Sequence, residues 1–210
     1  FPRLIDEWQI APKIWDAVRY EVDCRGEEGQ FILTGSAVPV ETKEITHSGA
    51  GRFTWLTMRT MSLYESQESS GEVSLEDLFD SPDKISGSNA HDIDSLAFLI
   101  CRGGWPHAIG MKRKAALSQA EDYFDAVVKS DINRADGVNK NPERVKRLMR
   151  SYARYQGAQI TGTALRDDIF ANETETISED TVLSYVNALK KIFVIEDMPS
   201  IHPLRQQHWA

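Results

Sequence analysis

The chain has 210 residues, of which 41% are apolar and 27% are charged, and its formal net charge is −8 at pH 7. This composition is typical of globular proteins and excludes a chain that is disordered throughout. The sequence contains no run of about 18 apolar residues and no basic segment followed by an apolar one near its start. We therefore expect neither a membrane span nor a signal peptide, and predict a cytoplasmic location.

Cysteine and histidine follow no metal-binding pattern. Cys24 and Cys101 lie far apart without a CxxC spacing, and the five histidines form no HExxH motif. We expect two free thiols and no structural metal. Because the chain starts with Phe1, directly before a predicted strand, we also expect it to be a piece of a longer protein.

Predicted strands and helices alternate in residues 1–66. An apolar pair at residues 4–5 predicts the end of a buried strand. Residues 10–26 predict an amphipathic helix with an apolar stripe of Ile14, Val18 and Val22, four residues apart. The apolar run at residues 31–33 predicts a second strand, covered on both faces, and residues 53–63 predict a third. This order indicates a βαβ unit with a parallel sheet.

The rest of the chain is predicted to be mostly helical. Residues 67–94 are acidic and rich in serine and glycine, so we expect a solvated connector with one small helix. Residues 95–138 predict two helices joined by a turn at "GGWP". Residues 139–200 predict a helix capped by Asn141, then two further helices, the second capped by Ser178, and a short strand "VIEDM". This is the order of a winged helix-turn-helix.

Two adjacent acids follow the first predicted strand. In P-loop ATPases an Asp in this position holds Mg²⁺ and a neighbouring Glu activates water, so Asp6 and Glu7 are candidates for these roles. A solvated strand end explains the same pair. The second strand ends in Thr34 and Ser36, which are candidates for sensing the γ-phosphate, although an ordinary turn also accounts for them. Arg52, after the glycine-rich "HSGAG", is a candidate arginine finger or a surface arginine paired with a local acid.

Four motifs in order carry a family resemblance: "PRLIDEWQIAPKIWDAVRYEVDCRGEEGQFILTGSA", "HSGAGRFTWLTMRTMSLYES", "CRGGWPHAIG" and "YFDAVVKSDINRADG". Together they resemble the prokaryotic AAA-like, archaeal-type P-loop ATPases that carry a C-terminal domain of unknown function, and the resemblance extends to about residue 200. It implies an α/β fold: the C-terminal half of a P-loop AAA+ parallel-sheet core, then a helical lid and a winged helix-turn-helix. It also implies ATP and Mg²⁺ as ligands, Asp6 and Glu7 as Walker B, Thr34 or Ser36 as sensor, and Arg52 as finger.

One departure from the family pattern is the phosphate-binding loop. No GxxxxGK[ST] motif occurs in the sequence. We expect this Walker A loop to lie upstream of Phe1, and expect the chain alone to be inactive and the intact protein to hydrolyse ATP. Residues 201–210 are predicted to begin a further, missing C-terminal domain.

The alternative to an enzyme is a nucleotide-switched or non-catalytic module that binds DNA or protein through the winged helix. Residues 139–166 contain seven basic residues and one acid. A solvated helix face explains these charges about as well. The candidate nucleic-acid contacts are Arg147, Arg150, Arg154, Asn187, Lys190 and Lys191. Further candidate partners are ATP and a second copy of the chain, and we expect no membrane.

Overall fold

The computed structural model describes residues 2–37, 49–173 and 176–198. Clustering of contacts divides them into two compact units. One contains the described residues up to Thr54 together with those from Val127 on, and the other is Trp55–Ala126. The predicted start of a further domain at 201–210 and part of the "HSGAGR" motif lie outside the described residues.

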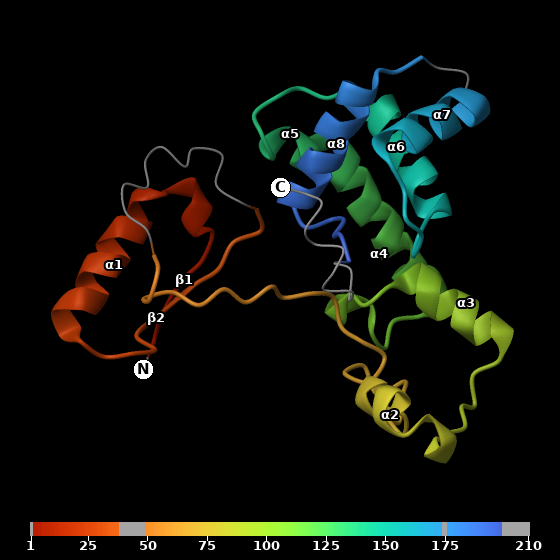
Figure 1. Ribbon diagram of the computed structural model, residues 1–210, viewed down its shortest axis with the longest axis horizontal. Helices are drawn as coiled ribbons and strands as arrows, with labels where there is room; N and C mark the ends of the chain where they lie inside the picture. Colours follow the sequence, from red (N-terminus) through yellow and green to blue (C-terminus); the bar gives the residue numbers. More distant parts are fainter. Residues whose placement is uncertain (1, 38–48, 174–175, 199–210) are drawn as a thin grey trace. The chain divides into compact units, whose positions relative to one another are not determined.

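The N-terminal strands form a small parallel sheet. Strand β1 (Arg3–Ile5) pairs with β2 (Phe31–Leu33), and helix α1 (Lys13–Arg25) connects them (Figure 1). Helix α1 ends at Gly26, which adopts φ 66°, a conformation that glycine reaches at little cost. The predicted βαβ unit is therefore confirmed.

The burial of this sheet differs from the prediction. Ile32 in β2 is 49% exposed and Leu4 in β1 is 66% exposed, so these strands are not covered on both faces by the described residues. Residues 53–63 form no strand, and the prediction of a third strand is wrong for the structure. A strand needs a neighbour for its backbone hydrogen bonds, and the described part of the sheet consists of β1 and β2.

An aromatic cluster packs on α1 instead. Trp15, which the predicted apolar stripe omitted, is buried and stacks on Phe53 with ring centroids 3.8 Å apart. Trp8 is also buried, and its ring centroid lies 5.3 Å from that of Trp15. This cluster fixes α1 to the segment between β1 and α1.

The second unit contains α2 (Leu75–Asp80), α3 (Ile93–Arg102) and α4 (Arg113–Ala126). Helices α3 and α4 pack against each other. The predicted turn between them is confirmed and uses two glycines. Gly103 ends α3 at φ 70°, and Gly104 accepts a hydrogen bond of 2.8 Å from the Met61 amide. A Cβ on Gly104 would lie 2.1 Å from the Met61 carbonyl oxygen, so this approach requires glycine.

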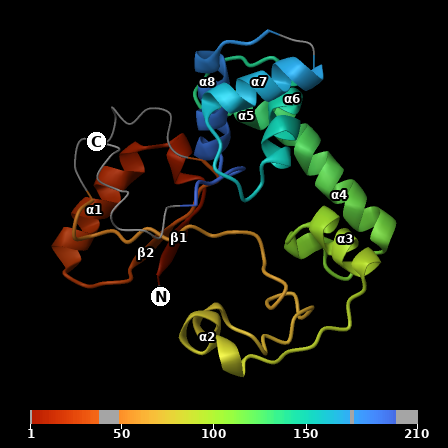
Figure 2. The same cartoon turned by 45° about the vertical axis from the view of Figure 1, so that its right-hand side comes forward.

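The C-terminal helices build the main apolar core. A π-helical turn (Val127–Asp131) leads into α5 (Ile132–Arg134), followed by α6 (Pro142–Arg154), α7 (Gly162–Glu173) and α8 (Glu179–Lys191). Figure 2 shows α6, α7 and α8 close together, and each of these helices contacts the other two. The fully buried side chains at their centre are those of Val128, Ile132, Val145, Leu148, Val182 and Leu189.

Two predicted helix starts are confirmed and one predicted strand is wrong. Asn141 and Ser178 accept hydrogen bonds from amides in the first turns of α6 and α8, which satisfies donors that have no partner inside the helix. Residues 194–198, predicted as a strand, form none. The described residues therefore supply helices in the expected order but no β-wing after α8.

Candidate functional site

Polar side chains from both strands meet at one edge of the sheet. Asp6 directly follows β1 and Thr34 directly follows β2. The two strands are parallel, so their carboxyl ends lie together. The Thr34 hydroxyl donates a hydrogen bond of 2.6 Å to Asp6 Oδ1, and the Thr34 amide donates to the Ile5 carbonyl at 2.9 Å. The structure thus brings together two candidates that lie 28 residues apart in the sequence.

Glu7 adopts a backbone conformation that is unusual for a residue with a side chain. Its φ is 54°, in the left-handed region, where a non-glycine residue is strained. The Glu7 amide donates to Asp6 Oδ1 at 3.0 Å, and Ser36 Oγ donates to Glu7 Oε2 at 3.2 Å. Each of the two carboxylates is therefore joined to one hydroxyl of the turn after β2.

Gln9 is a member of this cluster that the sequence analysis missed. It lies in the 3₁₀ turn Trp8–Ile10, and its Nε2 donates to Glu7 Oε2. The available signal was its position two residues after Glu7 in "DEWQ". The turn itself is held to the sheet because the Trp8 amide donates to the Thr34 carbonyl at 3.2 Å.

The cluster offers oxygen atoms as potential ligands. Carboxylate and hydroxyl oxygens are hard donors of the kind that Mg²⁺ prefers, so the donor set of Asp6, Glu7, Thr34 and Ser36 fits this ion. Among the described residues, no group of three or more His, Cys, Asp or Glu side chains is placed to hold a metal by itself. Mg²⁺ commonly binds through one or two carboxylates and takes its other ligands from water and substrate phosphates.

Arg52 pairs with an acid on α1. Its Nε donates to Asp23 Oδ1 at 2.6 Å and its Nη1 to the Ala50 carbonyl at 3.3 Å. Asp23 is in the last turns of α1, about 15 Å along the helix axis from Lys13 at a rise of about 1.5 Å per residue. The hydrogen bond that Arg52 donates to Asp23 holds the pKa of Asp23 below its usual value and raises the pKa of Arg52. This is the pairing with a local acid that the sequence also allowed.

Two of the basic nucleic-acid candidates form ion pairs within the fold. Arg154 donates to Asp168 on α7 through Nε at 3.1 Å and through Nη2, and Ser151 adds a bond of 2.6 Å to the same carboxylate. The bond from Arg154 is the main reason that the pKa of Asp168 is lowered. Lys190 pairs with Asp197 at 2.5 Å. These contacts join structural elements to each other.

The remaining candidates lie on the helices as follows. Arg147 is half-buried on α6 and Arg150 is exposed on the same helix. Asn187 is exposed on α8, and Lys191 is the last residue of that helix and exposed.

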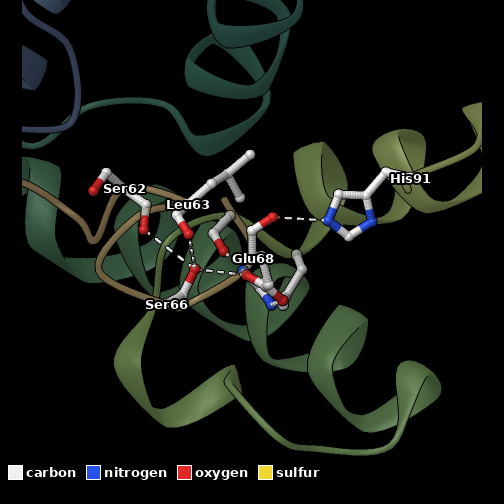
Figure 3. Close-up of polar contacts among 7 residues, drawn as sticks. Ser62, Leu63, Ser66, Glu68 and His91 are labelled. Atoms are coloured by element: carbon white, nitrogen blue, oxygen red, sulfur yellow. Dashed lines mark hydrogen bonds and ion pairs between the residues drawn. The ribbon is translucent and has the colours of Figure 1, made fainter. Parts of the chain in front are cut away.

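A second polar cluster, missed by the sequence analysis, lies in Trp55–Ala126. The acidic stretch was expected to be solvated, yet Glu68 forms a two-pronged ion pair with Arg102, whose side chain is 3% exposed. Figure 3 shows Ser66 between the Ser62 carbonyl and the Glu68 carboxylate, while the Glu68 carbonyl faces His91 at 2.9 Å. An open hollow of about 890 Å³ adjoins Glu68 and His91. Glu68 and Arg102 are 34 residues apart in the sequence, and no local pattern predicts that they pair.

Family models match two ranges of the chain. An AAA domain matches residues 3–67, which include β1, β2 and the carboxyl pair, and this supports an AAA-like ATP-binding protein. A domain of unknown function, DUF8612, matches residues 93–208. No curated protein and no solved structure matches the chain significantly. In the part that the structure describes, no helix is both long and apolar enough to cross a membrane. Because the second match covers more than half of the 210 residues, the chain belongs to the DUF8612 family, and residues ahead of that region match an AAA domain.

Proposed function

We propose that this chain carries the metal-binding and water-activating side of an ATP-hydrolysing site. The observation that carries the proposal is the hydrogen bond of 2.6 Å between Thr34 and Asp6, at the carboxyl ends of two adjacent parallel strands. Ligands of open α/β sheets bind at this edge. The match of residues 3–67 to an AAA domain supports nucleotide as the ligand.

Asp6 and Glu7 have different roles in this proposal. Asp6, which already receives hydrogen bonds from Thr34 and from the Glu7 amide, would hold Mg²⁺. The bound ion would neutralise charge on the phosphate oxygens. Glu7 would accept a proton from the attacking water. Its exposed carboxylate is held beside the turn after β2 and can reach a ligand at the sheet edge.

The turn after β2 would report the state of the nucleotide. The hydroxyls of Thr34 and Ser36 each donate a hydrogen bond to one of the two acids. Either hydroxyl could redirect its hydrogen bond to a γ-phosphate oxygen, which would couple the ligand to the position of the acids. Arg52, which pairs with Asp23 in this chain, would act as a finger only across a contact between subunits.

The test is the substitution Glu7→Gln, measured in the protein that carries this sequence, including any residues encoded on either side of it. We expect ATP turnover to fall at least about 100-fold, since a general base contributes about 10²–10⁴-fold. Binding of a fluorescent ATP analogue in the presence of Mg²⁺ should persist. The control is Glu28→Gln, an identical change at an exposed position in the loop before β2.

The outcomes separate the proposal from its alternatives. Lost turnover with retained binding in Glu7→Gln, and normal turnover in Glu28→Gln, support a hydrolytic role for Glu7. Unchanged turnover in Glu7→Gln rejects that role. A wild-type protein that binds the analogue but shows no turnover rejects ATP hydrolysis itself.

A further inference from the structure

We propose that Gln9 is a positioning residue that holds the Glu7 carboxylate against the turn after β2. The inference rests on the proposed ATP hydrolysis, and it concerns a residue that the roles given above do not use. Three observations carry it: the hydrogen bonds to Glu7, the surroundings of the Gln9 carbonyl, and the backbone of Glu7.

The first observation is that one carboxylate oxygen receives two donors. Gln9 Nε2 and Ser36 Oγ both donate to Glu7 Oε2. One donor comes from the turn after β1 and the other from the turn after β2, so together they fix the carboxylate between two backbone segments. No donor to Glu7 Oε1 is seen among the described residues, so this oxygen is the one that can accept the proton of the attacking water.

The second observation is an acceptor without a partner. Gln9 Oε1 is buried and receives no hydrogen bond within the described residues. It lies against Gly35, where a Cβ would come within 2.1 Å of it. An unsatisfied buried acceptor costs free energy, and here it adjoins the proposed base. The Gln9 amide is therefore held by its contact with Gly35 and by its bond to Glu7, because its buried carbonyl has no hydrogen bond of its own within the described residues.

The third observation is the left-handed backbone of Glu7, at φ 54°. The residue after this strained position is tied to the sheet, since the Trp8 amide donates to the Thr34 carbonyl at 3.2 Å. The Ile10 amide donates to the Glu7 carbonyl at 3.0 Å. The backbone is thus constrained, and the direction of the Glu7 side chain is then set by its two side-chain donors.

The experiment removes the amide but keeps its volume. In the protein that carries this sequence, Gln9→Met should lower kcat for ATP about 10- to 100-fold, because a small misplacement of a catalytic group costs about that much, and should leave KM within about twofold. Gly35→Ala should have a similar effect, because the added methyl displaces the Gln9 carbonyl. The double variant should be no worse than the more severe single variant. Gln30→Met is the matched control, since Gln30 donates to the Glu27 carbonyl at the opposite end of β2.

Each outcome has one meaning. If Glu7→Gln abolishes turnover but Gln9→Met retains normal kcat, the inference is overturned and the proposed function stands. If Gln9→Met raises KM with unchanged kcat, Gln9 contributes to binding only, and the positioning role is wrong. If Glu7→Gln itself has no effect, the proposed function fails and this inference fails with it. Circular dichroism and thermal melts confirm that each variant is folded before its rate is interpreted, and Gly35→Ala is an independent readout should Gln9→Met not fold.

Discussion

The ion pair between Glu68 and Arg102 allows a quantitative prediction for Trp55–Ala126. The Arg102 side chain is 3% exposed and the Glu68 side chain 24% exposed, and two charge-assisted hydrogen bonds connect them. The substitution Glu68→Gln keeps the shape of the side chain but leaves the buried guanidinium without a counter-charge. Breaking a buried pair in this way costs about 3–5 kcal/mol. Since water reaches part of Glu68, we expect the lower end of this range or slightly less, about 2–3 kcal/mol.

Native-state hydrogen exchange measures this loss locally. A cost of about 2–3 kcal/mol lowers the protection of amides by about 30- to 150-fold. The reporter amides are those of Met61 and Gly103, which are hydrogen-bonded within the same unit. Glu76→Gln, at an exposed position on α2, is the control.

A second variant separates charge from packing. Arg102→Met combined with Glu68→Gln removes both charges, and we expect it to recover part of the lost protection, because the pair is costly mainly when one partner is left alone. Equal protection in Glu68→Gln and Glu76→Gln would refute the reasoning. A double variant that is less stable than either single variant would show that packing, rather than charge, dominates.

The same pair predicts a dependence on pH. The hydrogen bond from Arg102 lowers the pKa of Glu68 below its ordinary value of 4.5. The unfolded chain therefore binds the proton more readily than the folded one, and stability rises with pH in that window. We expect the stabilisation to be complete above the unfolded pKa and to be lost as pH falls below about 4.5 and through the folded pKa. Glu68→Gln should flatten this part of the curve.

Three further predictions concern other elements. Asp168→Asn should weaken the ion pair with Arg154. It should also remove the loss of stability expected as pH falls below 3.8, the ordinary pKa of Asp, and urea unfolding at several pH values measures this loss. Gly104→Ala should destabilise the chain by about 1–3 kcal/mol, because its methyl would overlap the Met61 backbone, and a variant with an unchanged urea midpoint would contradict this. Thr34→Val should lower ATP turnover about 10- to 100-fold, since it removes the hydroxyl that orients the acid after β1, whereas Thr34→Ser should retain most of the activity.

Local chemistry was readable from the sequence alone. The caps Asn141 and Ser178 satisfy amides only two or three residues away, so short-range patterns were sufficient to place the starts of α6 and α8. The parallel pairing of β1 and β2 also followed from the sequence, because a helix between two short strands leaves few other connections. These two strands in turn placed Asp6 and Thr34 at one edge.

The tertiary structure decided everything that depends on a distant partner. Arg102 and Glu68, and likewise Arg154 and Asp168, look like ordinary surface charges in the sequence, and only packing shows that they pair. Residues 53–63 have the pattern of a strand, but a pattern forms a strand only where another backbone is present to accept its hydrogen bonds. The sequence determined which side chains could do chemistry at the sheet edge. Only the folded chain decided that Gln9 joins Glu7 there, because the 3₁₀ turn and Gly35 create the space for its amide.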